Sequence, residues 1–308
     1  MNKKLHIIGD LINNAYGRAR TAFTDKNLKG YQALAKSQSD LGVDFLDVNI
    51  DGTRQIQVRL EEMLAFLPDL IPALQEVTSV PLCMDNPSVD FQRVALKHYD
   101  CKKSGAPILN SIAASRVCLE EFVELVAEYD TNVVVMASEK FADGGSAQCL
   151  NPQDVYATAK YFAELLHTKA GRKNEHLIFD TGLAPVGADT YGLVNIGLDA
   201  MRLIRKDPDF QGVHITCGLS NFAWGTPKEI RHELEKAYLA VGMDAGLDFA
   251  IANPEKSRGP LPADHPLVGK LRHALEQGRP AEGESQETAG FRQAEAVMKI
   301  WSEGQPTE

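Results

Sequence analysis

Short apolar runs alternate along the chain with longer segments of helical periodicity. Continuous apolar runs are typical of strands that are buried on both faces, as in parallel sheets. Eight such runs predict strands at 5–9, 45–50, 81–85, 106–110, 133–136, 176–180, 213–219 and 249–253. Periodic segments predict helices at 31–41, 60–77, 89–99, 119–129, 151–167, 194–204, 227–241 and 267–275. This alternation predicts an α/β fold, a (β/α)8 TIM barrel.

The chain of 308 residues is long enough for such a barrel with insertions. We predict a barrel domain over 1–278 and a polar C-terminal tail over 279–308, with a short amphipathic helix at 291–301. A doubly wound open sheet is the structural alternative. That fold usually carries a glycine-rich dinucleotide fingerprint after an early strand, and this sequence has none there.

Capping residues, glycines and prolines predict where the helices begin, end or break. Asn151, followed by a proline, is a favourable helix start. Gly42 and Gly242 are predicted to end the helices that precede them. Pro68 and Pro72 are predicted to break or kink the helix at 60–77. The segment 139–150, with a Gly-Gly pair, matches no element that we can assign.

Composition narrows the class of protein. The chain has 32 basic and 42 acidic residues, a net charge of −10, and no Lys/Arg block, which argues against a nucleic-acid partner. The N-terminus lacks the apolar span of a signal peptide, and no run is long enough to cross a membrane. Five scattered cysteines without a CxxC pair indicate reduced thiols. We therefore predict a cytoplasmic protein.

Carboxylates and amides end almost every predicted strand. The end positions are Asp10, Asn49, Asp85, Asn110, Ser138, Asp180, Asn221 and Asn253. Any one of them is explained by a turn or a helix cap. In a barrel, however, the strand ends meet at the C-terminal face, where active sites are built. A ring of such groups without His or Lys suits a neutral, flat, hydrogen-bonding ligand.

The sequence lacks the residue patterns that Schiff-base catalysis and zinc binding require. A Schiff-base enzyme needs a buried lysine at a strand end, and only Lys140 lies nearby. A zinc site needs clustered His or Cys ligands, and the eight histidines are dispersed. A divalent metal on the carboxylates stays open, but no close-spaced motif requires it, so we predict no metal site. Cys83 and Cys217 fall within strands and are expected in the core.

At these strand ends the chain resembles the methyltetrahydrofolate:corrinoid methyltransferases. That family shares a pterin-binding barrel with dihydropteroate synthase and with a domain of cobalamin-dependent methionine synthase. The resemblance covers about residues 5 to 255. The individual motifs are short, but their order on successive strands makes the set specific. The matching segments are 7–13 (Ile-Ile-Gly-Asp-Leu-Ile-Asn), 46–49 (Leu-Asp-Val-Asn), 82–85 (Leu-Cys-Met-Asp), 108–111 (Ile-Leu-Asn-Ser), 178–180 (Ile-Phe-Asp) and 218–221 (Gly-Leu-Ser-Asn).

The resemblance implies a set of binding residues and partners. It implies pterin contacts from Asp85, Asn110 and Asp180, with Asn221 close to N5. Four further polar residues of the matching segments are expected to complete the substrate-binding site: Asp10, Asn13, Asp47 and Asn49. It also implies tetrahydrofolate or methyltetrahydrofolate as substrate, cobalamin or another corrinoid on a separate partner protein, and a homodimer.

Two departures from the family pattern concern the outer part of the site. Relatives often have Glu where this chain has Asp10, and often Asp where it has Asn253. The direction of methyl transfer also stays open. It could run from folate to corrinoid, or back to tetrahydrofolate, as in the second methyltransferases of O-demethylase systems.

Two alternatives share the pterin pocket. Dihydropteroate synthase uses Ser-Arg-Lys at strand seven and Arg-x-His at strand eight, whereas this chain has Ser220-Asn221 and the sequence Ala-Ile-Ala-Asn at 250–253. The other alternative is a non-catalytic pterin-binding barrel, which a methyl-transfer assay with a cob(I)alamin acceptor would exclude.

Asn221 is the predicted catalytic residue. An amide can donate to N5 or accept from its protonated form, and it would stabilise the transition state without titrating. The plainer interpretation is a turn between Gly218 and Gly225. Phe222 and Trp224 are expected to line the barrel mouth, with packing of Trp224 on the next helix as the alternative.

Overall fold

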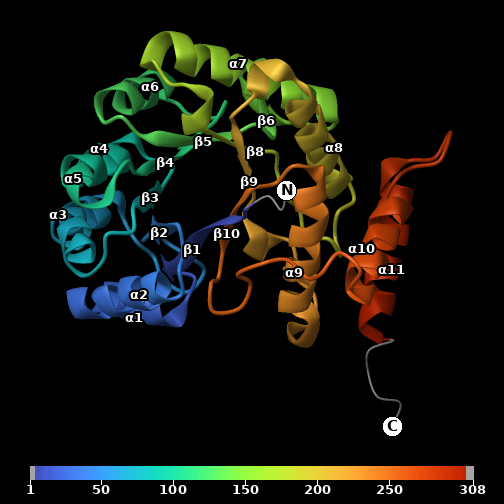
Figure 1. Cartoon of the computed structure of the whole chain (residues 1–308), viewed down its shortest axis with the longest axis horizontal. Coiled ribbons are helices and arrows are strands. Elements are labelled where there is room, and N and C mark those ends of the chain that lie inside the picture. Colours follow the sequence, from blue (N-terminus) through green and yellow to red (C-terminus); the bar gives the residue numbers. More distant parts are fainter. Residues whose placement is uncertain (1–3, 303–308) are drawn as a thin grey trace.

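The computed structural model describes residues 4–302 and contains an eight-stranded parallel sheet that curves into a barrel (Figure 1). The sheet order is β10-β1-β2-β3-β4-β5-β8-β9, so neighbouring strands follow the chain around the barrel. The strands are β1 (His6–Asn13), β2 (Phe45–Asn49), β3 (Leu82–Asp85), β4 (Ile108–Ile112), β5 (Asn132–Met136), β8 (Leu177–Asp180), β9 (His214–Thr216) and β10 (Phe249–Ala252). The predicted TIM-barrel fold is confirmed.

The barrel closes between β9 and β10 through a short contact. A single parallel bridge joins Gly218 to Ile251, and the Ile251 amide donates to the Cys217 carbonyl at 2.9 Å. The strand predicted at 213–219 is regular only over His214–Thr216, because the chain turns into a 3-10 helix at Leu219–Asn221.

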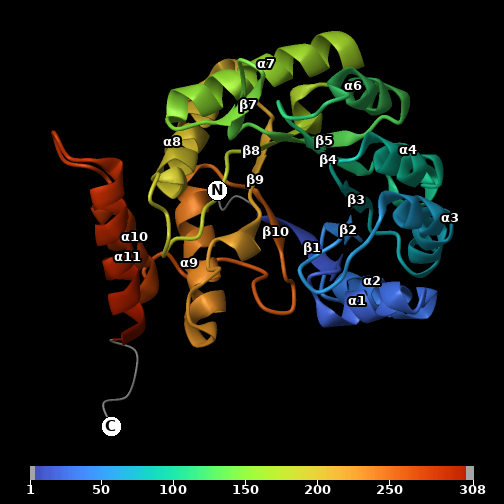
Figure 2. The ribbon, with the colours of Figure 1, turned by 180° about the vertical axis from the view of Figure 1, so that it is seen from behind.

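Helices surround the strands in both views (Figures 1 and 2). They are α1 (Gly17–Thr24), α2 (Leu28–Asp40), α3 (Leu60–Val77), α4 (Val89–Lys97), α5 (Cys101–Ser104), α6 (Leu119–Glu128), α7 (Pro152–Ala170), α8 (Leu193–Lys206), α9 (Lys228–Ala245), α10 (Pro266–Gln277) and α11 (Gln286–Ser302). Two further 3-10 helices lie at Asn174–His176 and Pro208–Phe210. The eight predicted helices are present, and Asn151 caps α7 by accepting from the Asp154 amide. None of the helices described is long and apolar enough to span a membrane.

Several elements differ from the prediction. The helices α1 and α5 were not predicted, and the unassigned segment 139–150 forms an antiparallel hairpin of β6 (Glu139–Ala142) and β7 (Gly145–Gln148). Helix α3 runs unbroken through Pro68 and Pro72, so the predicted break is wrong. Its buried face of Phe, Leu and Ile side chains packs on the core, which outweighs the two lost backbone hydrogen bonds.

Gly242 does not end its helix, which continues to Ala245. A Cβ atom at Gly242 would lie 3.0 Å from the Leu247 side chain, so a larger residue there would require Leu247 to shift. The helix ends at Gly246, whose φ of 125° is disfavoured for residues with a side chain. Gly42, by contrast, lies just past α2 with a φ of 78°, as expected of a C-terminal cap.

The C-terminal helix α11 packs against the barrel next to α10 (Figures 1 and 2). The Gln293 amide donates to the Val186 carbonyl at 3.1 Å, which ties α11 to the loop after β8. A Cβ atom at Gly290 would lie 2.8 Å from the Asp189 carbonyl oxygen, so α11 approaches this loop closely. The amphipathic segment predicted at 291–301 is therefore part of a longer helix that supports one side of the site.

Candidate active site

The C-terminal ends of the strands enclose a cavity of about 510 Å³. It is lined by Asp10, Asn13, Asp47, Asn49, Asp85, Asn110, Ser111, Ala113, Arg116, Met136, Glu139, Asp180, Gly218, Ser220, Asn221 and Ile251. All eight residues predicted for the substrate site are among them. The parallel register explains this, since strand ends such as Asp85 and Asn110 are direct neighbours in the sheet.

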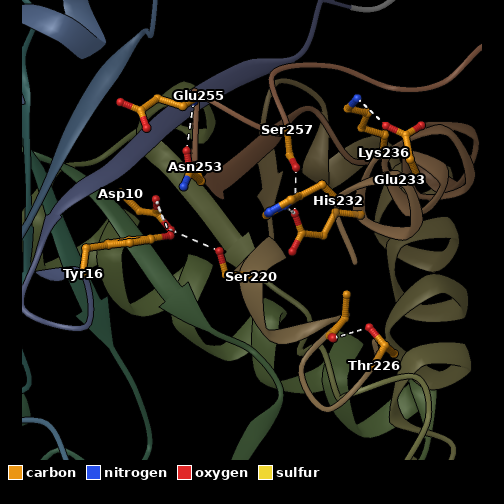
Figure 3. A network of polar contacts seen from close by, with 12 residues as sticks. Asp10, Tyr16, Ser220, Thr226, His232, Glu233, Lys236, Asn253, Glu255 and Ser257 are labelled. Atoms are coloured by element: carbon orange, nitrogen blue, oxygen red, sulfur yellow. Dashed lines mark hydrogen bonds and ion pairs between the residues drawn. The ribbon is translucent and has the colours of Figure 1, made fainter. Parts of the chain in front are cut away.

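Asp10 forms one corner of the cavity with two hydroxyl donors (Figure 3). The Tyr16 hydroxyl donates to both carboxylate oxygens, at 3.1 and 3.0 Å, and the Ser220 hydroxyl donates to Oδ2 at 3.2 Å. Burial raises the pKa of Asp10 to about 6, against the opposing effect of these hydrogen bonds. Strand β1 continues to Asn13, so Asp10 lies within the strand rather than at its predicted end.

Asp85 and its neighbours on β2 form the adjoining wall. The Asn49 amide donates to Asp85 Oδ2 at 2.9 Å. Burial raises the pKa of Asp85, although this hydrogen bond and the charge of Arg116 act in the opposite direction. Asp47 lies deeper, fully buried, and neither of its carboxylate oxygens has a hydrogen-bond partner within residues 4–302.

Asp180 lies between this cavity and a second hollow of about 360 Å³. The second hollow extends under the β6–β7 hairpin and the loop after β8. Asp180 Oδ1 accepts from the Gly182 amide at 2.8 Å, and burial raises the pKa of the carboxyl to about 6. Its other oxygen, Oδ2, makes no hydrogen bond within residues 4–302 and could accept one from a ligand.

Asn221 lines both hollows from the 3-10 helix after β9. Its side chain is exposed and has no hydrogen-bond partner in the described part of the chain. The amide folds back over Gly218, since a Cβ atom there would lie 2.9 Å from Asn221 Nδ2. Glycine at 218 thus leaves room for an amide that can both donate and accept.

The remaining predicted positions have other surroundings. Ser138 lines the second hollow. The Asn253 side chain accepts from the Glu255 amide at 2.9 Å and is absent from both linings (Figure 3). Phe222 was expected at the mouth, but it is fully buried against Tyr238, with ring centroids 4.4 Å apart, so that prediction is wrong. Trp224 is 61% exposed, which argues against the alternative that it packs on the next helix.

Two charged residues of the cavity were not predicted. Arg116, in the loop after β4, donates to the Ser111 carbonyl and to the Ser111 hydroxyl, both at 2.9 Å. Glu139, at the start of the hairpin, accepts from Ser115 at 2.8 Å and from Ser146 at 2.5 Å. Arg116 comes from a loop and Glu139 from a short, mostly exposed hairpin strand, where apolar periodicity gives no information about which side chains turn inward.

The cavity is lined mostly by acidic and neutral polar side chains. Its lining has five carboxyl side chains and one cationic side chain, Arg116. Within residues 4–302, no three His, Cys, Asp or Glu side chains are grouped so that they could hold a metal ion. The cavity therefore presents hydrogen-bond acceptors to a ligand with N–H donors.

Known proteins with similar sequences bind pterins. The sequence profile of the family described as "Pterin binding enzyme" matches residues 18–253, more than half of the chain. The chain belongs to the pterin-binding enzyme family. A relative from Eubacterium limosum, methylcorrinoid:tetrahydrofolate methyltransferase, is 23% identical over 281 residues, covering 89% of this chain and 97% of that protein.

Solved structures of dihydropteroate synthases share the fold. The enzyme from Vibrio fischeri superposes with a TM-score of 0.60 at 17% identity, covering 90% of this chain and 95% of that one. The enzyme from Xanthomonas albilineans gives 0.59 at 18% identity, covering 89% and 92%. At this identity the likeness shows the barrel fold alone and does not distinguish between the reactions that the barrel supports.

The polar groups of this pterin-binding barrel fit a pterin ring. The pyrimidine edge of a pterin offers an exocyclic amine and a ring N–H side by side, and a carboxylate can accept from both. Buried acceptors without partners are available at Asp47, and the buried Thr181 hydroxyl in the second hollow is also unpaired within the described residues. Such unsatisfied groups are costly unless a ligand or water completes them.

Proposed function

We propose that this chain transfers a methyl group between N5 of tetrahydrofolate and the cobalt of a corrinoid carried by a separate protein. One observation carries the proposal: the loop after β9 brings Ser220 and the amide of Asn221 to the cavity, and among residues 4–302 no lysine side chain lines it. The relative from Eubacterium limosum supports the same reaction, and its name gives the direction from corrinoid to tetrahydrofolate. We propose that direction for this chain.

The residues of the cavity divide into two roles. Asp85, Asn110 and Asp180 hold the pyrimidine edge of the pterin through hydrogen bonds. Asn221 acts at N5, where it donates to the nitrogen or accepts from its protonated form as the charge on N5 changes. Because an amide does not titrate, Asn221 stabilises charge in the transition state and does not serve as an acid.

The corrinoid supplies the cobalt centre that carries the methyl group, and it reaches N5 through the open mouth of the barrel. No nucleophilic side chain of the protein is needed for such a transfer. The buried Cys83 and Cys217 agree with this, because burial raises the pKa of both thiols well above the ordinary value.

The test is turnover with purified protein in both directions. In the forward assay, methylcobalamin or a methylated corrinoid protein is incubated with tetrahydrofolate, and methyltetrahydrofolate is measured. In the reverse assay, methyltetrahydrofolate is the methyl donor and cob(I)alamin is the acceptor. We expect methyl transfer in both directions and no condensation of a dihydropterin pyrophosphate with 4-aminobenzoate. Condensation without methyl transfer would establish a dihydropteroate synthase, and pterin binding without either reaction would indicate a binding protein.

A further inference from the structure

The carboxyl group of Asp47 lies below the ring of polar strand ends. In the register of β2 and β3, Asp47 pairs with Cys83, which belongs to the apolar cluster inside the barrel. Side chains at paired positions of a parallel sheet share a face, so Asp47 points into the barrel interior. Asn49, two residues on, contacts Asp85 at the level above.

The surroundings of Asp47 at this level are mostly apolar. The interior cluster consists of Ile8, Cys83, Ile108, Val134, Ile178 and Phe249. Asp47 is 0% exposed, lines the floor of the cavity, and has no hydrogen-bond partner for either oxygen within residues 4–302. A charged carboxylate without a partner in such a place is strongly unfavourable.

The charged groups that face Asp47 oppose its ionisation. Burial has the largest effect, and the charges of Asp85 on β3 and Asp10 on β1 add to it, so the pKa of Asp47 is raised well above its ordinary value. The neighbouring Cys83 thiol on β3 has the opposite and smallest effect. The nearby cation, Arg116, acts on Asp85 rather than on Asp47. Two neighbouring buried carboxyl groups under these conditions titrate as a pair and keep one proton between them.

We propose that Asp47 and Asp85 share one proton when the cavity is empty, and that binding of a pterin releases this proton to solvent. The ligand's exocyclic amine and ring N–H take the place of the proton as hydrogen-bond donors to the pair. No bond of the ligand breaks in this step, and the proton is taken up by the buffer. The inference rests on the proposed function only in taking a reduced pterin as the ligand.

Calorimetry measures this proton directly. Tetrahydrofolate is titrated into the full-length protein at neutral pH in buffers with different enthalpies of ionisation, and the dependence of the heat on the buffer gives the protons released. We expect the wild-type protein to release more than about half a proton per site. Asp47→Asn places a neutral amide of the same shape at the floor and should release almost none. A proton exchanged by the ligand itself would be the same in both proteins.

Asp189→Asn is the matched control. Asp189 is a buried carboxyl group outside the cavity, and the Leu193 and Val194 amides donate to it at 2.8 Å, so this variant should keep the proton release of the wild-type protein. Binding by the wild-type protein without proton release, or equal release from Asp47→Asn, would overturn the inference and leave the proposed function standing. Absence of tetrahydrofolate binding would overturn both.

A second measurement needs no variant. In the infrared difference spectrum of bound minus free wild-type protein, the C=O stretch of a protonated carboxyl group should be lost on binding. A spectrum without that loss would contradict the inference even if Asp47→Asn failed to fold.

Discussion

At the scale of single residues, burial of the carboxyl groups in the site lowers the stability of the folded protein when these groups are ionised. Asp180 illustrates the balance, because burial raises its pKa from 3.8 to about 6 and only the Gly182 amide compensates. Between these two pH values the folded protein binds more protons than the unfolded chain. Its stability therefore falls as the pH rises through this window, and the full penalty is present at pH 7.

Replacing Asp180 with Asn removes this penalty and keeps the acceptor for the Gly182 amide. We expect Asp180→Asn to raise the free energy of unfolding at pH 7 by up to about 3 kcal/mol. The gain should shrink toward zero at about pH 3, where the wild-type carboxyl is largely protonated in both states. Urea denaturation of both proteins at the two pH values measures it. A difference that did not depend on pH would mean that the burial of Asp180 does not set its titration.

The residues of the site could be predicted where they lie on a strand or, like Asn221, shortly after one. Asp85, Asn110 and Asp180 follow from apolar runs that end in a polar residue, because parallel strands bring their ends to one face. Arg116 lies on a loop and Glu139 begins the β6–β7 hairpin, and the course of both segments depends on tertiary contacts such as Ser111 with Arg116 and Ser115 with Glu139. No local pattern in the sequence reports such contacts.

At the scale of elements, α11 approaches the loop after β8 so closely that the stability of the fold depends on glycine at position 290. A Cβ atom there would meet the backbone at Asp189 and Thr190 at 2.8 Å. Gly290→Ala should lower the free energy of unfolding by about 1–3 kcal/mol, since backbone has to move. Gly269 in α10 is the matched control, because nothing lies within 4 Å of its Cβ position. Gly269→Ala should raise stability by about 0.5–1 kcal/mol. Thermal or chemical unfolding measures both, and equal effects would contradict the packing of α11 described above.

Helix boundaries show where sequence reasoning fails at this scale. Gly242 and Pro68 are local signals for a helix end or break, but both lie inside helices. In each case burial against the barrel decides the outcome: Gly242 makes room for Leu247, and α3 buries an apolar face on both sides of its prolines. Helix propensity alone could not predict these helix boundaries, because they depend on the residues that pack against each helix.

At the scale of the whole molecule, the barrel presents its cavity to a partner protein in our proposal. Trp224 is exposed on the loop after β9, which also carries Asn221. Trp224→Ala should leave stability within about 0.5 kcal/mol of wild type. It should reduce turnover with a protein-bound corrinoid more than turnover with free cobalamin. Equal losses with both acceptors would place Trp224 outside the docking surface. The homodimer, the cytoplasmic location and a place in O-demethylation stay predictions.

The central claim is that the Asn221 amide stabilises N5 during methyl transfer, and the rate of transfer with purified Asn221 variants tests it most directly. The account predicts that Asn221→Ala lowers kcat by roughly 10²–10³, while tetrahydrofolate affinity falls much less, because Asp85, Asn110 and Asp180 still hold the ring. Asn221→Asp should shift the pH profile, since an ionised carboxylate accepts but does not donate. Gly218→Ala should also lower kcat, because its methyl group would displace the amide from its position 2.9 Å away. A kcat near the wild-type value in Asn221→Ala would contradict the account and leave Asn221 as a turn residue.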